Sequence, residues 1–576
     1  MHSIREQLLG SISSGFFLEV ACRVYLENHD KKESVGQEVA DLHNAGKIDA
    51  IAEFRKLKSS DQQHDFFMTR HVLEHALPSI ESPVAAVMDC VKHLVEEAGN
   101  NMAAGTLIPP FIDFCEADAG RPDEVLSAAL NEVDDTFDFI TPAITAGSNL
   151  QLEQYANKAV ELCSHENILI RSRAVHALGR IKYHDREELI SKSLQAIQTT
   201  LEQDCDEYLY AAILRSTVAL YKADNSTEKH AIKLLQHILP QQDDIVLYEA
   251  AQCLFSKLPA SMVDLLLNTL AQINIQRINI IRDIDFGLCS LIKHGMREKV
   301  LLFLEKLLVQ REQEFSIRQF DTLNLAICNN KEGYLDFLIT RWLLSKQVAL
   351  GRAAADLLEN TSEYGTPVAV DLDQLQELPE GIRVFLVRKA CGWFFHKPIS
   401  ATSFIVSLID TASGDEIEEI TDILFHPLLI NYSGCVKDYL VKTVEEEPSE
   451  KVKLVIDTVL EQLKNYHESL NSSISELQPT QAQREVFHRY QSRLFAESYK
   501  VAQENSIFNL ITTKMCILYG TRSVYYIHHG PGDQKSRQEM ALAEHSHYFE
   551  LPSLERIDPH GLDYTLYVFR VEGCDS

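Results

Sequence analysis

The sequence predicts a mainly α-helical protein: an α-solenoid of repeated helix pairs, followed by a small C-terminal α+β module with an antiparallel sheet. Three observations lead to this prediction. The 576 residues include only 23 Gly and 17 Pro, too few for a protein built mainly from short strands and tight turns. Apolar residues recur at helical spacing through most of the chain, and near the C-terminus the spacing changes to that of strands. A hydrophobic content of 45% is enough for a large core.

Residues 1–65 are expected to form a helical cap. A solenoid leaves the apolar face of its first helix pair uncovered, so an additional element must bury that face. Apolar side chains for this purpose are available at Phe16, Phe17, Leu18 and Tyr25. The solenoid itself is expected to occupy residues 66–464.

Residues 150–275 show the clearest periodicity. One amphipathic helix is predicted from a stripe at Ile170, Ala174, Ala177, Leu178 and Ile181, and a second is predicted over 187–201. Equivalent helices begin near Leu209 and Leu247, so the position of Ile170 recurs at nearly constant intervals. The length of this interval, with two helices in each repeat, is typical of an α-solenoid.

The stretch Ile170-Arg171…Ala174…Ala177-Leu178-Gly179…Ile181 resembles the first helix of a HEAT repeat, with its Val-Arg…Ala…Ala-Leu-Gly core. The next two repeats depart from this pattern, because Ile213 replaces the usual small residue and no Arg follows Leu209 or Leu247. The resemblance implies a right-handed α-solenoid of HEAT-like helix pairs. HEAT-like proteins act as adaptors, transport receptors and assembly factors. The resemblance implies only this broad class, because a fold does not by itself determine a function.

The C-terminal part differs in its pattern. Polar residues 465–480 are predicted to be a linker, and Thr480 with Gln483 matches a capping box that starts a helix running to about residue 505. Residues 481–576 are therefore expected to form a helix plus a small antiparallel β module, with strands at 515–519, 523–527, 547–551 and 564–569.

The net charge of −30 disfavours a general nucleic-acid binder and docking on an anionic membrane. No apolar run is long enough to cross a membrane, and the N-terminus lacks the features of a signal peptide. The twelve cysteines form no C-x-x-C pair. We therefore expect a cytoplasmic protein with free thiols.

Histidines supply the candidate metal sites. The stretch from His71 to His75 matches the inverted zinc-protease pattern H-x-x-E-H, in which His71 and His75 would bind zinc and Glu74 would act as base. His545 and His547 would share one strand face, near His528, His529 and His560. The alternatives are a partly exposed helix surface for the first group and hydrogen-bonding histidines in turns for the second.

Aromatic pairs supply the candidate partner-binding residues. Trp393 and Phe394 belong to a dense aromatic patch that is either core or an exposed anchor for a partner. Tyr525 and Tyr526 would point to opposite faces of one strand, so one of them is available for a contact.

We predict a non-enzymatic scaffold or adaptor without a cofactor, since no phosphate-binding glycine motif or nucleophile elbow is present. Its solenoid surface would hold a protein or peptide partner carrying a basic patch. One alternative is a metal-dependent hydrolase. Another is a nucleic-acid-associated helical-repeat protein, for which Arg171, Arg173 and Arg180 form the best local basic cluster, or an acidic mimic of a nucleic acid. In a further alternative the β module carries the function and the solenoid only positions it.

Overall fold

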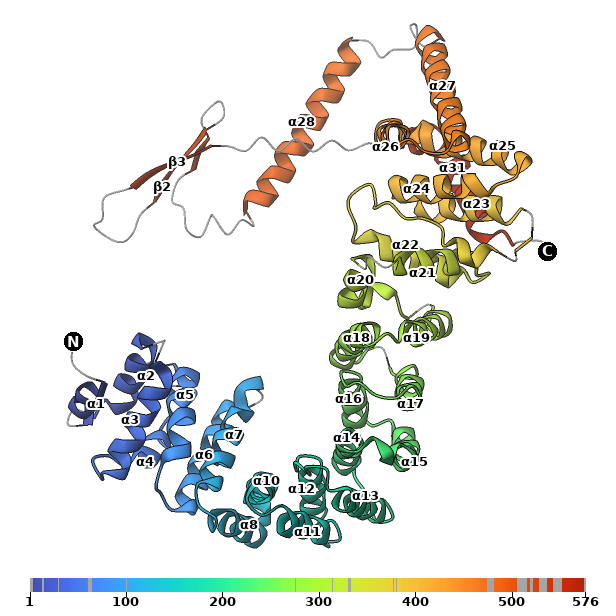
Figure 1. Cartoon of the computed structure of the whole chain (residues 1–576). Coiled ribbons are helices and arrows are strands. Elements are labelled where there is room, and N and C mark those ends of the chain that lie inside the picture. The colour runs from blue at the N-terminus through green and yellow to red at the C-terminus, as the bar shows by residue number, and fades with distance from the viewer. Residues whose placement is uncertain are drawn as a thin grey trace. The chain divides into compact units, whose positions relative to one another are not determined.

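The computed structural model describes residues 4–573 apart from 13–14, 29–30, 61–64, 100, 275, 313, 330–332, 377, 380, 474–480, 505–514, 518–521, 528–535 and 542–551. Most of the residues that the structure describes are helical, which makes the fold mainly α (Figure 1). The chain divides into two compact units, Met1–Ala326 (unit 1) and Ile327–Ser576 (unit 2). None of the described helices combines the length and the apolar composition that a membrane crossing needs.

Unit 1 begins with nine described α-helices before α10, and the first four of them lie within residues 1–65, the range predicted to form the cap. The ring of Phe17 is buried edge-on against that of Phe54, with 6.2 Å between the ring centres, whereas Phe16 is exposed. The helices of this part are α1 (Ile4–Ile12), α2 (Phe17–Glu27), α3 (Lys32–Asn44), α4 (Ala50–Phe54), α5 (Phe66–Ala76), α6 (Val84–Ala98), α7 (Ile108–Glu116), α8 (Arg121–Asn131) and α9 (Val133–Thr136).

The helix pairs predicted at residues 150–275 are present. Ile170, Ala174, Ala177 and Leu178 are all buried, as the amphipathic stripe requires. Asn167 and Asp206 cap the first helices of two successive pairs, because the side chain of each accepts a hydrogen bond from a backbone N–H of the first turn. The helices are α10 (Ile140–Leu150), α11 (Leu152–Leu162), α12 (Ile168–Leu178), α13 (Glu187–Leu201), α14 (Glu207–Ala223), α15 (Glu228–Ile238), α16 (Asp244–Cys253), α17 (Ala260–Leu270), α18 (Ile278–Lys293) and α19 (Arg297–Gln310).

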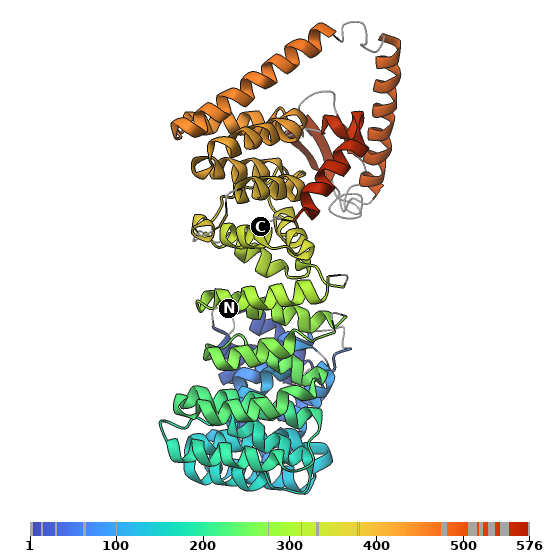
Figure 2. The same cartoon turned by 90° about the vertical axis from the view of Figure 1, so that its right-hand side faces the viewer.

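These helices stack in two rows, which is the packing of a helical repeat protein. The first row is α10, α12, α14, α16 and α18, and each of these helices contacts the next. The second row is α11, α13, α15, α17 and α19, and neighbouring helices in this row also contact one another. Figure 2 shows the green pairs from α14 to α19 as successive layers. Each pair therefore buries its apolar face against the following pair.

Unit 2 is also helical. The predicted linker at 465–480 overlaps α27, which continues as far as Ser473, and the helix predicted after the linker corresponds to α28. The helices are α20 (Asp321–Cys328, which crosses the boundary between the units), α21 (Tyr334–Leu344), α22 (Val348–Glu359), α23 (Ile382–Phe394), α24 (Pro398–Leu408), α25 (Gly414–Ile423), α26 (Cys435–Glu445), α27 (Glu450–Ser473), α28 (Gln481–Glu504), α30 (Ser553–Ile557) and α31 (Pro559–Val571).

The predicted fold class, with a C-terminal α+β module whose sheet continues to residue 569, is wrong, because the last described elements of the chain are helices. Residues 564–569, the last predicted strand, lie in α31, which packs against α23. The apolar residues of the run Tyr-Thr-Leu-Tyr-Val-Phe fit the spacing of a strand as well as that of a helix. In the structure Leu562 and Leu566, which are four residues apart, are both buried, as expected for one face of a helix. Three short antiparallel strands occur before α31: β1 (Met515–Ile517), β2 (Arg522–Ile527) and β3 (Ser536–Ala541). The predicted strand at 547–551 lies outside the described residues.

Candidate binding groove

Two adjoining pockets in unit 1 form one groove along the first row of helices. The larger pocket has a volume of about 620 Å³ and is lined by residues of α6, α7, α10 and α12. The second has a volume of about 410 Å³ and is lined by residues of α12, α14 and α16. Phe137, Arg173 and His176 line both pockets. We call the two pockets together the groove.

An irregular segment before α10 forms part of the groove wall. After α8 the chain makes the short helix α9 and a tight helical turn over Phe137–Phe139 before α10 begins. The ring of Phe139 is buried 5.1 Å from that of Phe111, which anchors the turn. Asp135, Phe137 and Asp138 consequently lie at the groove.

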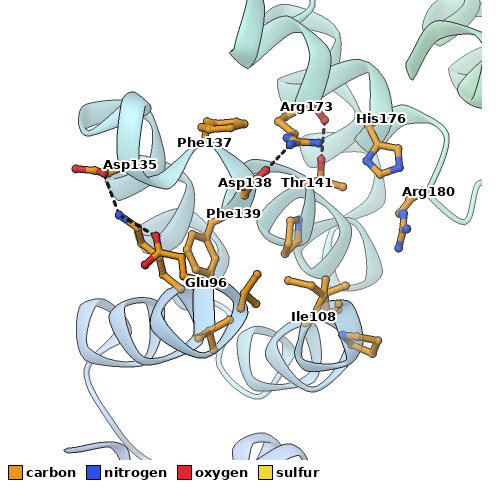
Figure 3. A pocket seen from close by; sticks show the side chains of 17 residues that line it. Glu96, Ile108, Asp135, Phe137, Asp138, Phe139, Thr141, Arg173, His176 and Arg180 are labelled. Atoms are coloured by element: carbon orange, nitrogen blue, oxygen red, sulfur yellow. Dashed lines mark hydrogen bonds and ion pairs between the residues drawn. The ribbon is translucent and has the colours of Figure 1, made fainter. Parts of the chain in front are cut away.

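Helix α12 and the residues just after it supply the polar side. Arg173, His176 and Arg180 have the spacing of one helix face, away from the buried stripe that includes Ala174 and Ala177. Figure 3 shows the three side chains one after another on one side of the pocket, with Ile108 below them in the view. The Thr141 hydroxyl donates a 2.9 Å hydrogen bond to the backbone oxygen of Arg173, which ties α10 to α12 at this point.

Helix α14 contributes Arg215, which follows His176 by the same interval that separates Leu209 from Ile170. His176 and Arg215 therefore occupy equivalent positions in successive repeats. The helices come close together here, since a β-carbon on Gly179 would lie 2.6 Å from the Oγ of Ser216. The stacking of the repeats gathers three arginines around one histidine. We call Arg173, Arg180 and Arg215 the arginine cluster.

Two members of the arginine cluster have carboxylate partners. Arg173 forms an ion pair with Asp138, and its guanidinium carbon lies 5.1 Å from the centre of the Phe137 ring. Arg215 lies 3.4 Å from a carboxylate oxygen of Glu249. For Arg180, the part of the chain that the structure describes supplies neither an ion pair nor a side-chain hydrogen bond. Arg180 is therefore the member of the arginine cluster without a direct carboxylate partner among the described residues.

Burial and the arginine cluster together keep His176 neutral. Burial is the larger cause, and the positive charges of Arg180, Arg215 and Arg173 add to it, which lowers the pKa of His176 to about 3. The pKa of Arg180 is also lowered, by burial first and then by Arg215. Burial raises the pKa of Glu249, against the effect of Arg215. At neutral pH the imidazole of His176 is therefore an uncharged hydrogen-bonding group in a positively charged setting.

The other side of the larger pocket is apolar. Ile108, Pro109 and Ile112 come from α7, and Pro142 comes from α10. At the far edge Lys92 forms ion pairs with Glu96 and Asp135, at 3.8 and 2.9 Å. The groove thus offers an apolar recess beside hydrogen-bond donors and a positive charge, which is the usual composition of a site that binds rather than one that only packs.

The structure places His71, Glu74 and His75 on α5, outside the groove. Glu74 is occupied by its neighbours, since one carboxylate oxygen lies 3.3 Å from Nε of the buried Arg70 and the other lies 2.5 Å from Nδ1 of His71. The hydroxyl of Thr106 also donates to Glu74. Across the described ranges, no three His, Cys, Asp or Glu side chains are grouped so that they could hold a metal ion. His545 and His547 lie outside those ranges.

The predicted partner-binding residues lie in unit 2. Phe394 is a core residue. The indole of Trp393 is half-buried against Gly351, and the guanidinium carbon of Arg570 lies 5.5 Å from its ring centre. Tyr525 and Tyr526 belong to β2, where their backbones pair with Gln538 and Arg537 of β3.

Reasoning from the sequence named two of the groove residues, Arg173 and Arg180, as part of a basic cluster with Arg171. In the structure Arg171 is buried and donates hydrogen bonds to three backbone oxygens, so it is separate from the arginine cluster. Phe137, His176 and Arg215 were missed. A signal for them exists: His176 lies on the polar face of its helix between Arg173 and Arg180, and Arg215 follows it by one repeat length.

No protein-family model and no curated protein matches the sequence. Among solved structures, the chain is similar to one described as "Circular tandem repeat protein with novel repeat topology and enhanced subunit contact surfaces". The similarity covers 81% of this chain and 96% of that one, with 14% sequence identity and a TM-score of 0.17. The packing of α10 to α19 in two rows, and not this likeness, identifies a helical repeat protein.

Proposed function

We propose that this protein is a binding scaffold that holds a segment of a partner protein in the groove of unit 1. Stacked helix pairs expose a continuous row of first helices, and helical repeat proteins commonly use such a surface for binding. The proposal includes a HEAT-like solenoid that acts without a catalytic centre or a cofactor.

The observation that carries the proposal is the continuity of the groove. Two pockets share Phe137, Arg173 and His176, so one extended segment can lie across three successive first helices, α10, α12 and α14. Apolar side chains and the polar side chains of Arg173, His176 and Arg180 line the same pocket along this path. Such a combination supports binding of a peptide-like ligand, which presents apolar and polar side chains in alternation.

Site-specific photo-cross-linking tests this proposal. A photoreactive amino acid replaces Tyr208, which lines the groove and is 61% exposed. The matched control carries the same group at Leu302, which is 52% exposed on α19 in the second row. We expect a discrete cross-linked protein from cells at position 208 and a much lower yield at 302. Equal yields at both positions, or no adduct at 208, would contradict the proposal.

The expectation of a basic patch on the partner follows from the net charge of −30 of the whole chain. Attraction between such surfaces is screened by salt. When the cross-linking is repeated in a cell lysate, the yield at position 208 should therefore fall as the salt concentration during irradiation rises. Unchanged recovery across the series would remove the electrostatic part of the proposal and leave the groove as the binding site.

Metal analysis of the purified protein tests the rival interpretation as a hydrolase. A metal-dependent enzyme requires close to one metal ion per chain, so a zinc content below about 0.1 per chain argues against that interpretation. A stoichiometric zinc content that is lost in His71→Ala would favour it instead.

A further inference from the structure

We propose that the groove recognises a glutamate or aspartate side chain of the bound segment, with its carboxylate on Arg180 and a neighbouring large apolar side chain in the recess beside Ile108. This inference rests on the proposed function and specifies the chemistry of the ligand. It also departs from the expectation of a basic partner at this point of the surface.

The first step of the argument is the charge balance. Arg173 and Arg215 are paired with Asp138 and Glu249, whereas Arg180 has no carboxylate partner among the residues that the structure describes. Arg180 lies near other arginines without a direct counter-ion, and a carboxylate placed on it would supply that contact locally. A carboxylate matches it, because a guanidinium binds a carboxylate through two parallel hydrogen bonds.

The second step is the position of His176. Figure 3 places its ring between Arg173 and Arg180, on the side of the pocket that carries the positive charges. No hydrogen bond joins the ring to any of the described residues. A neutral imidazole is thus available to donate a hydrogen bond to the carboxylate without adding another positive charge.

The third step is the apolar recess. Ile108, Pro109, Ile112 and Pro142 form a wall within the same pocket as Arg180. The pocket volume of about 620 Å³ accommodates one or two large side chains. A peptide with a leucine or aromatic residue near an acidic residue would fill the recess and neutralise Arg180 at the same time.

A peptide carboxylate fits better than the two other anions of biological macromolecules. A phosphorylated side chain brings a charge near −2, whereas Arg180 is, in the described part of the chain, the single arginine of the cluster without a carboxylate partner, and the carboxylates of Asp135 and Asp138 line the same pocket. A nucleic-acid backbone would pass Asp135, Asp138 and Glu249, and nucleic-acid affinity comes from many phosphate contacts made together. The carboxylates at the rim of the groove would therefore repel a polyanion, whereas a single acidic side chain can still reach Arg180.

Fluorescence anisotropy with short labelled peptides tests the inference on the full chain. The probes are ten-residue peptides in which Leu precedes or follows Glu by one to three residues. Matched probes replace Glu with Gln, Lys or phosphoserine, or replace Leu with Ala, and a ten-nucleotide single strand completes the set. We expect the best Leu–Glu peptide to bind about tenfold more tightly than its Gln and Ala counterparts, because each change removes one of the two contacts.

An Arg180→Met variant assigns the charge contact. Arg180 lies at the edge of the pocket and makes no side-chain hydrogen bond or ion pair with the described residues, so the variant is expected to fold normally, which the melting temperature verifies. The variant should bind the Glu peptide with about tenfold lower affinity and the Gln peptide with an affinity within about twofold of the wild type. A double-mutant cycle gives this pattern when the two groups are in direct contact. Arg186→Met, another exposed arginine on unit 1, is the control and should bind like the wild type.

Several results would overturn the inference. These are equal binding of the Glu and Gln peptides, tighter binding of the Lys peptide, the phosphoserine peptide or the oligonucleotide, an unchanged affinity in Arg180→Met, and no binding by any peptide. If a cross-link at position 208 is still observed, the proposed function survives this failure, and only the chemistry of the ligand is wrong.

Discussion

The hydroxyl of Ser216 on α14 donates a 2.8 Å hydrogen bond to the backbone oxygen of Val175 on α12. This buried bond marks a close approach of the two helices. Gly179 faces the same serine, and a β-carbon there would lie 2.6 Å from its Oγ and 2.8 Å from its Cα. The backbone of Gly179 has an ordinary helical conformation, with φ −72°. Glycine is therefore required here for space and not for backbone freedom.

Replacing Gly179 with valine should destabilise unit 1 and separate α12 from α14. Insertion of side-chain volume at a tight helix contact costs about 1–3 kcal/mol of the free energy of unfolding. Urea denaturation followed by circular dichroism measures the change. Gly10→Ala is the control, because a β-carbon there meets nothing within 4 Å. A variant Gly179→Val as stable as the wild type would show that the helices separate without cost.

Replacing Arg171 with methionine should also destabilise unit 1. Arg171 is 6% exposed and donates hydrogen bonds of 3.0, 3.1 and 2.7 Å to the backbone oxygens of His165, Glu166 and Asp204. Loss of the donor leaves these acceptors unpaired, at a cost of about 1–3 kcal/mol in the free energy of unfolding. Arg186→Met, whose ion pair with Glu153 is exposed, should cost less than about 1 kcal/mol. Similar losses in both variants would contradict this account.

His176 should make stability depend on pH. Its pKa in the folded protein is about 3, against an ordinary value of 6.5. Between these values the unfolded chain binds a proton that the folded chain does not, so stability falls as the pH decreases from 6.5 toward 3. The slope from this residue is at most about 1.4 kcal/mol per pH unit.

The comparison between wild type and His176→Gln isolates this contribution. We expect any stability advantage of the wild type over the variant to shrink as the pH is lowered from about 7 to about 4.5. Chemical denaturation at several pH values gives the two curves. Parallel curves for wild type and His176→Gln would contradict the prediction.

Replacing Lys389 with methionine should loosen α31. The buried ammonium group of Lys389 donates to the backbone oxygens of Arg570 and Glu572, at 2.6 and 2.7 Å, and so holds the C-terminal end of this helix. In Lys389→Met we expect hydrogen exchange of the α31 amides to be about tenfold faster. Loss of the two hydrogen bonds lowers the free energy needed to open this helix locally. Lys442→Met, in an exposed ion pair with Glu446, should leave this exchange unchanged. Unchanged exchange in Lys389→Met would show that apolar packing alone holds the helix.

Removal of residues 511–576 should destabilise unit 2, because it deletes α31 together with the strands. Leu562 and Leu566 are buried, and the backbone of α31 lies directly over Gly392 of α23. Replacement of residues 511–551 by a flexible linker keeps α30 and α31 and should preserve the melting temperature. Binding measurements on this second variant separate a role of the strands from damage to the solenoid. Equal melting temperatures for the two deletions would contradict the proposed role of α31.

Local pattern accounts for most of the helices that were predicted. The predicted helix at 187–201 has the observed bounds of α13. The spacing of apolar residues and the polar residues before the helix are local signals, which can be read within a few helical turns. The strand predicted at 564–569 was wrong for the opposite reason. That run fits both periods, and the contact that decides between them is with α23, which lies far earlier in the chain.

Reasoning from residue order was sufficient to identify a mainly α-helical repeat protein, because the period of the apolar residues is set within each short segment. The position of the ligand site could not be found in this way. The arginine cluster joins Arg173 and Arg180 to Arg215 from the next repeat, and the apolar recess comes from α7 and α10. Stacking of separate helix pairs brings these residues together, and the distances between them depend on contacts such as the one between Gly179 and Ser216.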